Sequence, residues 1–375
     1  MNGSAALKDV AKLFLRLGVT AFGGPAAHIA MMQQEVVENK KWMSEQHFLD
    51  LIGATNLIPG PNSTEMAIHI GYEKAGWKGL IVAGLCFILP AVFITGFFAW
   101  LYKQYGHLPQ VQPFVYGIKP AIIAVILAAV YPLAKKSLKT MELGIIGATV
   151  LILSLLNFNE IYLMFGAGIL ASVLAAFKRQ NTVNGFFFPA LLQISNTSIS
   201  PATNMTLFWI FLKIGAILYG SGYVLFAFLD AELVARGLLS RQQLIDAIAV
   251  GQFTPGPVFS SVTFIGYQIN GLTGATVSTI GIFLPSFVFV ALLNPLVKRM
   301  RHSKLFAAFL DAVNIASVAI IVAVCYAMGK DSISDWRTIV IALISITLTF
   351  GFKKINSAWI VLGGSLTGYL LTLFT

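Results

Sequence analysis

The stretch GATNLIPGPNST, residues 53–64, places Pro-Gly-Pro in the middle of an apolar part of the chain. Pro59 and Pro61 each lack a backbone N–H donor, and Pro59 also disfavours helical geometry at Ile58. A continuous buried helix cannot pass through this point. The stretch therefore predicts a broken helix with a polar lining inside an apolar protein. The polar residues around the break are Thr55, Asn56, Asn62, Ser63 and Thr64.

The composition of the chain is that of a membrane protein. Of its 375 residues, 57% are hydrophobic and 11% are charged, whereas soluble domains carry about 25% charged residues. Residues 79–102 contain no charged side chain and are long enough to cross a bilayer, which takes about 20 helical residues. Residues 247–297 contain no Asp, Glu, Lys or Arg. The composition predicts an all-α, multi-pass integral membrane protein that lies in the lipid bilayer.

The positive charge of the chain lies in short loops. A formal net charge of +10 raises the question of nucleic-acid binding. The basic residues cluster between apolar runs, however, which is the pattern of cytoplasmic loops in membrane proteins. Nucleic-acid binding is therefore not expected. The clusters are Lys135, Lys136 and Lys139; Lys178 and Arg179; Lys298, Arg299, Arg301 and Lys304; and Lys353 and Lys354.

The chain contains the same unit twice. FLRLGVTAFGG at residues 14–24 matches FLKIGAILYGS at residues 211–221, and Pro-Gly-Pro at 59–61 recurs at 255–257. The offset between matching positions is 197 residues for the first pair and 196 for the second, which is too regular for chance. Each unit holds about six apolar stretches. The predicted domains are a first repeat at 1–180, a linker at 181–205 and a second repeat at 206–375.

The basic loops also predict how the two repeats are oriented. The basic loop of the first repeat, 135–139, follows the fourth apolar stretch, whereas that of the second repeat, 298–304, follows the third. Equivalent loops thus carry opposite bias, which predicts inverted-topology repeats. Inversion requires an odd number of crossings per repeat, and five in each gives about ten transmembrane helices. Broken or re-entrant segments are expected near 10–34, 48–71, 207–229 and 244–268.

The Pro-Gly-Pro interruptions predict a binding site for a small anion. A helix that restarts after such a break presents free backbone N–H groups and a partial positive charge, and helix ends of this kind bind anions. Inverted repeats with discontinuous helices are typical of transporters that bind substrate between the repeats. We expect substrate contacts at Asn56, Pro59, Gly60, Pro61, Asn62, Ser63 and Thr64, and at Gln252, Pro255, Gly256, Pro257 and Ser260.

Small residues make a second interruption in each repeat. Gly23 and Gly24 in the first repeat correspond to Gly220 and Ser221 in the second. One interpretation is an unwound turn that faces the substrate. The other is close helix packing through small residues, which is common in membranes. The sequence leaves both interpretations open.

Few charged residues lie within the apolar stretches, and each has two interpretations. Arg16 and its repeat counterpart Lys213 are candidate anion-binding cations, unless their long side chains snorkel to the interface. Glu65, in the first turn after Pro-Gly-Pro, is either a proton carrier or an acid that stabilises the helix N-terminus. The repeated acids Glu35 and Glu232 are candidates for proton coupling or for interfacial ion pairs.

His28 is the fourth candidate for proton coupling. Neither His28 nor His69 recurs in the second repeat, and no histidine pair has the spacing of metal ligands. Cys86 and Cys325 lie far apart in different apolar runs. We expect no metal or other cofactor, and no enzyme, because a nucleophile–base arrangement is missing. The lack of a GxxxxGK[ST] sequence disfavours an ATP-driven pump.

Three segments resemble the signature segments of the chromate ion transporter family in its two-domain form. They are FGGPAAHIAMMQQEVV at 22–37, the stretch that begins PGPNSTEM at 59–91 and the stretch that begins FTPGPVFSS at 253–286. The resemblance covers nearly the whole chain. It implies a bacterial inner-membrane secondary transporter that exports chromate, driven by the proton gradient, with sulfate as a mimic of the substrate and a cellular role in chromate resistance.

The resemblance leaves the substrate and the symmetry of the site open. Val258 and Phe259 replace the polar Asn62 and Ser63, so the site in the second repeat is less polar than that in the first. Chromate and sulfate share size and charge, and nothing in the residues separates them. The alternative function is therefore import or exchange of sulfate or another small oxyanion on the same scaffold. The sequence also leaves a homodimer open.

Overall fold

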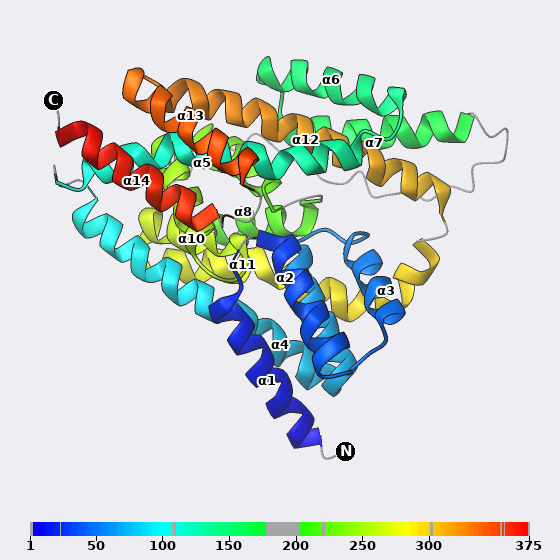
Figure 1. The fold of residues 1–375 in the computed structure, drawn as a ribbon. Helices are drawn as coiled ribbons and strands as arrows, with labels where there is room; N and C mark the ends of the chain where they lie inside the picture. The colour runs from blue at the N-terminus through cyan, green and yellow to red at the C-terminus, as the bar shows by residue number, and fades with distance from the viewer. Residues whose placement is uncertain are drawn as a thin grey trace.

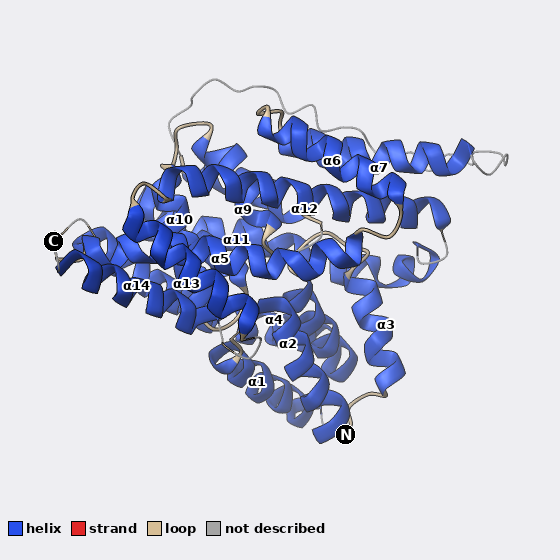
Figure 2. Cartoon of the chain, turned by 45° about the horizontal axis from the view of Figure 1, so that its top comes forward, coloured by secondary structure: helices blue, strands red, loops and turns tan. Residues whose placement is uncertain are grey.

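The computed structural model describes residues 3–22, 24–106, 108, 110–177, 203–219, 222–300, 303–352, 355 and 357–373, and all regular elements within them are helices (Figure 2). The first repeat contains α1 (Gly3–Thr20), α2 (Gly24–Gln33), η1 (Gln34–Asn39), α3 (Glu45–Thr55), α4 (Asn62–Tyr105), α5 (Gln112–Ser137), α6 (Met141–Leu155) and α7 (Glu160–Phe177). The second repeat contains α8 (Asn204–Ile217), α9 (Val224–Leu229), η2 (Asp230–Val234), α10 (Arg241–Phe253), η3 (Val258–Ser260), α11 (Ser261–Met300), α12 (Lys304–Ser332), α13 (Trp336–Gly351) and α14 (Ser357–Leu373).

Some of the predicted features fall outside the described residues. These are Gly23, Gly220 and Ser221, the basic residues Lys178, Arg179, Arg301, Lys353 and Lys354, and most of the predicted linker 181–205.

The described helices confirm the prediction of an all-helical, multi-pass membrane protein. Five of them, or parts of them, are long and apolar enough to cross a bilayer, and four shorter apolar helices accompany them. The five candidate spans are Asn62–Tyr105, Gln112–Ser137, Glu160–Phe177, Val258–Leu292 and Leu305–Ser332. The predicted total of about ten crossings stays a prediction.

The two longest helices, α4 and α11, each fold back on themselves at a glycine. Gly76 has φ 61° and ψ −150°, and Gly271 has φ 61° and ψ −148°, a backbone region that is almost exclusive to glycine. A Cβ atom on Gly71 would lie 2.4 Å from the carbonyl oxygen of Gly79, although residues eight apart in a straight helix are about 12 Å apart. We therefore divide α4 into a short arm, 62–74, and a long arm, 77–105.

The same reversal divides α11. A Cβ atom on Gly266 would lie 2.4 Å from the carbonyl oxygen of Gly274, so a short arm, 261–269, packs against a long arm, 272–300. The repeated spacing of these glycines lets two helix backbones touch without side chains between them.

The interrupted segments of the first repeat fold into helical hairpins. In the first hairpin, Arg16 of α1 pairs with Glu35 of η1 at 2.6 Å. In the second, His47 near the start of α3 lies 3.6 Å from Glu73 near the end of the short arm of α4. Residues far from each interruption are thus close together, so each hairpin has its interruption at the tip. We call the connection between the two helices of a hairpin its tip.

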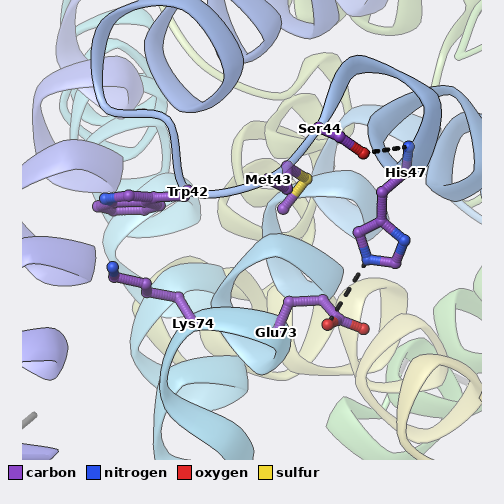
Figure 3. Close-up of a pocket in the computed structure, with 6 residues that line it drawn as sticks. All are labelled: Trp42, Met43, Ser44, His47, Glu73 and Lys74. Atoms are coloured by element: carbon purple, nitrogen blue, oxygen red, sulfur yellow. Dashed lines mark hydrogen bonds and ion pairs between the residues drawn. The ribbon is translucent and has the colours of Figure 1, made fainter.

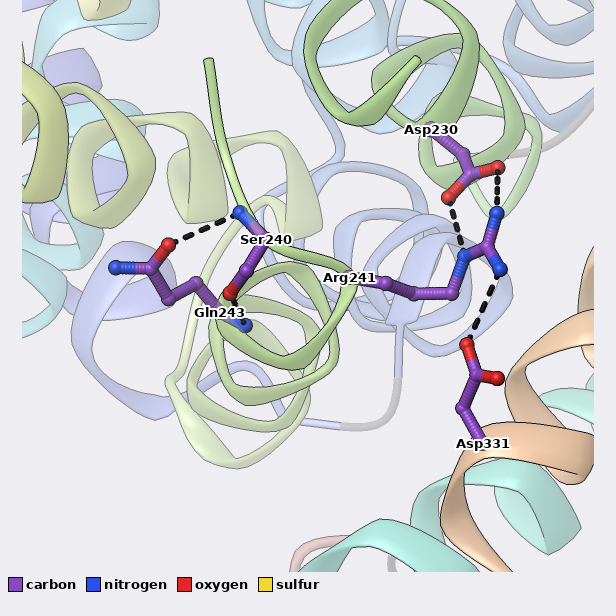
Figure 4. A network of polar contacts seen from close by, with 5 residues as sticks. All are labelled: Asp230, Ser240, Arg241, Gln243 and Asp331. Atoms are coloured by element: carbon purple, nitrogen blue, oxygen red, sulfur yellow. Dashed lines mark hydrogen bonds and ion pairs between the residues drawn. The ribbon is translucent and has the colours of Figure 1, made fainter. Parts of the chain in front are cut away.

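The second repeat forms the corresponding hairpins. Lys213 of α8 pairs with Glu232 of η2, which folds the first hairpin of this repeat in the same way. Arg241 at the start of α10 binds Asp230 of η2 through two nitrogens, at 3.0 and 3.2 Å, and also binds Asp331 of α12 at 3.1 Å (Figure 4). The base of the second hairpin is therefore fixed to both the first hairpin and α12.

Contacts between helices fix the relative placement of the two glycine reversals. Gln268, three residues before Gly271, donates to the carbonyl oxygen of Ala99 at 2.9 Å. Ala99 lies 22 residues after the start of the long arm of α4, or about 33 Å along a helix. The Gly271 reversal is therefore close to the far end of this long arm, whereas the Gly76 reversal is at its beginning.

A second set of contacts joins the ends of three other helices. Lys139, just after α5, pairs with Asp311 in the second turn of α12 at 2.6 Å. Ser172 near the end of α7 approaches the carbonyl oxygen of Leu305 at 3.3 Å. The ends of α5 and α7 and the beginning of α12 therefore lie on one side of the protein. Figure 1 shows α6, α7 and α12 packed in one layer, above the hairpins of the first repeat.

Candidate functional site

The hairpin tips of the two repeats bind each other reciprocally. The backbone N–H of Gly60, in the first Pro-Gly-Pro, donates to the carbonyl oxygen of Leu218 at 2.8 Å. The N–H of Gly256, in the second Pro-Gly-Pro, donates to the carbonyl oxygen of Ala21 at 2.9 Å. Leu218 and Ala21 follow α8 and α1 at equivalent places in the repeats. Each Pro-Gly-Pro tip thus binds the first hairpin tip of the other repeat.

The other sides of the tips also meet. A Cβ atom on Gly24 would lie 3.6 Å from the hydroxyl of Tyr223, and one on Gly222 would lie 3.8 Å from the ring of Pro25. These are ordinary contact distances between the first hairpins of the two repeats. All four tips therefore converge on one place, as a site between the repeats requires.

The first Pro-Gly-Pro tip holds a carboxyl group against its backbone. Gly60 has φ 134°, and a Cβ atom there would lie 2.3 Å from Oε1 of Glu65 and 2.8 Å from Oγ of Ser286. Glu65 is fully buried. Only a glycine leaves room for this carboxyl group between the tip and the long arm of α11.

The second Pro-Gly-Pro tip has a methyl group and a backbone carbonyl beside it instead of a carboxyl group. A Cβ atom on Gly256, whose φ is 87°, would lie 3.0 Å from Cβ of Ala91 and 3.2 Å from the carbonyl oxygen of Gly18. Ala91 follows Leu-Pro in the first repeat as Ser286 does in the second. The two tips therefore pack against equivalent positions of the long arms, but only the first one has a carboxyl group beside it.

His28 links three parts of the site. Its Nε2 lies 3.1 Å from the carbonyl oxygen of Ala21, and its Nδ1 lies 3.4 Å from Oγ of Ser63. A carbonyl only accepts, so Nε2 carries the hydrogen, and Nδ1 accepts from the hydroxyl. The same Ala21 oxygen accepts from Gly256. Leu225 replaces His28 in the second repeat and is buried, so this link exists on one side only.

Several buried polar atoms at the tips have no hydrogen bond within the described part of the protein. Leaving a buried donor unpaired costs about 1–3 kcal/mol, so these groups are suited to a ligand that accepts hydrogen bonds. They come from both repeats, on either side of the two Pro-Gly-Pro tips. They are Oγ1 of Thr64, Nε2 of Gln252, and the hydroxyls of Ser260 and Ser261.

The duplicated site lies within two segments that match one protein family. The family described as Chromate transporter matches residues 8–172 and again residues 205–369. The chain belongs to the chromate transporter family. It is therefore a membrane transporter and not an enzyme.

Individual members of the chromate transporter family align with nearly the whole chain. The chromate transport protein of Cupriavidus metallidurans is 32% identical over 96% of this chain and 92% of its own length. The probable chromate transport protein of Synechococcus elongatus is 29% identical over 97% of this chain and 95% of its own length. The chromate transport protein of Pseudomonas aeruginosa is 27% identical over 96% of this chain and 91% of its own length. No solved structure matches the chain.

The predicted anion-binding cations of the transporter pair with the repeated acids. Arg16 binds Glu35 at 2.6 Å, and the Arg16 side chain is 53% exposed. Lys213 binds Glu232, which Arg236 also binds at 2.7 Å, and the Glu232 side chain is only 3% exposed. These contacts lie within the first hairpin of each repeat. A substrate role for Arg16 and Lys213 stays a prediction, and so does proton coupling by Glu35 and Glu232.

The amide side chains of the first Pro-Gly-Pro tip bind each other. Nδ2 of Asn62 donates to Oδ1 of Asn56 at 2.8 Å. This bond joins the residues on either side of the break, so both side chains help to shape the tip. Pro61 is the N-cap of the short arm of α4.

Sequence reasoning missed the partners that the tips find in the opposite repeat. Ser286, Leu218 and Ala21 are not part of the Pro-Gly-Pro motif, and two of them contribute only a carbonyl oxygen. A signal for Ser286 exists, because the aligned repeats differ there, with a serine opposite Ala91. A carbonyl acceptor leaves no such signal, since every residue has one.

Proposed function

We propose that this transporter exports chromate across the bacterial inner membrane in exchange for protons, with the dianion bound at the four hairpin tips. The observation that carries the proposal is the reciprocal pair of hydrogen bonds, Gly60 to Leu218 and Gly256 to Ala21. It unites two helix starts and several unpaired donors in one buried place. Helix starts of this kind favour anions.

Chromate as the substrate is supported by the chemistry of the tips and by the relatives. A tetrahedral dianion accepts hydrogen bonds on every side, and the tips offer hydroxyl, amide and backbone donors. Three aligned relatives carry chromate transport in their names. Sulfate has the same shape and charge, so it is the expected competitor. A sulfate or other oxyanion importer or exchanger remains the second candidate function.

The first-repeat residues proposed for substrate binding include the Pro-Gly-Pro tip and the polar start of the short arm of α4. The buried Glu65 carboxyl group lies beside Gly60 of this tip, which gives the anion site a titratable neighbour. Glu65 is therefore our first candidate for proton coupling. Glu65 would be protonated in one state of the site and ionised in the other, as the dianion binds and leaves. The proton and the dianion would then cross the membrane in opposite directions.

Alternating access is supported by the burial of the site. Thr64, Glu65, Ser260 and Ser261 are all at most 1% exposed. An anion reaches them only when the repeats move apart on one side. The two reciprocal hydrogen bonds, Gly60 to Leu218 and Gly256 to Ala21, would break one at a time. The site would then open toward one face of the membrane and stay closed toward the other.

The proposed transport predicts a specific result in vesicles. Inside-out membrane vesicles that contain the transporter should take up labelled chromate when a proton gradient is imposed, and sulfate should reduce this uptake. A protonophore should abolish the gradient-driven part. Uptake that does not change when the gradient is collapsed would contradict proton coupling. Uptake of sulfate in preference to chromate would favour the second candidate function.

Inverted repeats predict the location of two loops. The Gly76 and Gly271 reversals lie near opposite ends of the long arm of α4, and Lys139 contacts the beginning of α12, which both support inversion. Reporters fused after Lys139 and after Lys304 should therefore both report a cytoplasmic location. If the two reporters lie on opposite sides of the membrane, the inverted arrangement is wrong.

A further inference from the structure

One face of the short arm of α4 carries a titratable side chain at every turn. Glu65, His69 and Glu73 are four residues apart, a spacing that places their side chains one above the other on the helix. The series begins at the central site and ends at the surface. We propose that Glu65, His69 and Glu73 form a relay that carries protons between the substrate site and the protein surface. This inference rests on the proposed proton-coupled function.

The middle member of the relay has no other evident purpose. His69 is 1% exposed, and neither of its ring nitrogens has a hydrogen bond within the described residues. Burying an imidazole without partners is costly, and a hydrocarbon side chain would fill the same space better. The titratable neighbours of His69 on its own helix are the carboxyl groups one turn before and one turn after it.

The outer end of the relay opens into a surface cavity of about 320 Å³ between α3 and the base of the short arm (Figure 3). Oε2 of Glu73 lies there 3.6 Å from Nε2 of His47, and both side chains are partly exposed. Lys74 also lines the cavity, with its Nζ 4.8 Å from the centre of the Trp42 ring. A proton that reaches Glu73 therefore meets water and a second titratable group.

The outer end also has the charge pattern of the cytoplasmic face. The base of this hairpin carries four lysines within two short stretches, 40–41 and 74–78, and such clusters favour the cytoplasm. The relay would then release protons to the cytoplasm, as proton-driven export of an anion requires. The four residues are Lys40, Lys41, Lys74 and Lys78.

The inner end of the relay lies at the Pro-Gly-Pro tip. The Glu65 carboxyl group lies beside the backbone of Gly60 and the hydroxyl of Ser286. Tyr219, from the first hairpin of the second repeat, is close enough to interact electrostatically with the same carboxyl group. His28 contacts Ser63 of the same short arm. Glu65 is thus the relay member that a bound dianion can influence directly.

The second repeat shows that the fold does not require these groups. Between Pro-Gly-Pro and Gly-Tyr it is one residue shorter, so Glu65 corresponds to Ser260 or Ser261. His69 corresponds to Phe264, and Glu73 corresponds to Gln268. The equivalent short arm of α11 packs in the same way without a titratable side chain at any of these three positions. The relay is therefore a property of the first repeat alone, added to a shared framework.

The transfer itself needs no reactant other than the proton. Protonated Glu65 passes its proton to one ring nitrogen of His69, and the imidazolium releases a proton from its other nitrogen to Glu73. From Glu73 the proton enters the cavity. Each hop spans one helical turn, about 5–6 Å between Cβ atoms, which side chains of this length bridge by changing rotamer.

The test uses the full chain in proteoliposomes that contain a pH-sensitive dye and chromate. His69→Phe installs the residue that the second repeat has at this position, so the fold is expected to tolerate it. Chromate-driven proton flux should fall by about a hundredfold, the contribution of a positioned acid–base group. Exchange of chromate for chromate, which needs no net proton release, should be unchanged. Glu73→Gln should also lower the chromate-driven proton flux. His69→Glu, which puts a titratable group back at this position, should restore part of the flux that His69→Phe loses.

A matched control is Glu38→Gln, which removes an exposed carboxyl group of η1, four residues before Trp42 of the cavity and outside the relay. It should leave proton flux unchanged. Wild-type proton flux with normal coupling in both His69→Phe and Glu73→Gln would overturn the relay while leaving the proposed function intact. Absence of chromate-driven proton flux in the wild type would overturn the proposed function itself. If His69→Phe does not fold, Glu73→Gln alone decides, because its side chain is 38% exposed and its loss is tolerable.

Discussion

Replacing Gly60 by alanine is expected to slow chromate transport about a hundredfold while the protein still folds. The added methyl group would lie 2.3 Å from the Glu65 carboxyl oxygen and 2.8 Å from the Ser286 hydroxyl. Both are ends of side chains that can rotate away, so the fold survives, at a backbone cost of about 1–3 kcal/mol for alanine at φ 134°. The carboxyl group is then displaced by about 1 Å or more, and misplacing a positioned group by that distance costs about a hundredfold in rate. Chromate flux per folded transporter in proteoliposomes measures this effect.

Gly76→Ala is the matched control for the Gly60 substitution. Gly76 also has a positive φ, but a Cβ atom there would have nothing within 4 Å. The strained backbone costs about 1–3 kcal/mol, which should lower the apparent melting temperature in detergent. Transport per folded molecule should stay near the wild-type value, because the tips are untouched. Wild-type flux in Gly60→Ala would show that the position of the Glu65 carboxyl group has no role in transport.

The interruptions and their duplication could be predicted from the sequence because their causes are local. Pro59 and Pro61 break a helix wherever they occur in its interior, and the six apolar stretches of each repeat coincide with the helices and hairpins of the structure. The sequence left open whether the interrupted segments are broken spans or re-entrant hairpins. The contact between His47 and Glu73 decides for the hairpin in the second segment.

The contacts between the repeats could not be predicted because nothing local specifies them. Gly60 binds a carbonyl oxygen 158 residues further along the chain, and any residue at position 218 would offer that oxygen. Likewise, the spacing of Arg16 and Glu35 is compatible with two separate snorkelling side chains as well as with one ion pair. Only the reversal of the chain between α1 and α2 brings them to 2.6 Å.

Removing the acid from the two repeated ion pairs is expected to have very different consequences. Glu232 is 3% exposed and has two cationic partners, Lys213 and Arg236. Glu232→Gln leaves these two like charges together in a buried place, and breaking a buried pair costs about 3–5 kcal/mol. Glu35→Gln opens a pair whose Arg16 side chain is 53% exposed, and exposed pairs contribute only about 0–1 kcal/mol.

The two variants therefore separate a structural role of the repeated acids from a role in proton coupling. If the acids mainly hold the hairpins, Glu232→Gln should unfold at a clearly lower temperature than Glu35→Gln, and the Glu35 variant should keep the wild-type pH dependence of chromate transport. If Glu35 carries protons, its variant should be as stable as the wild type but should transport chromate independently of the proton gradient. A stable Glu232→Gln protein would contradict the buried pair as a support of the second repeat. That result would favour substrate binding by Lys213, because a lysine whose ion pair with Glu232 is not needed for stability is free to bind an anion.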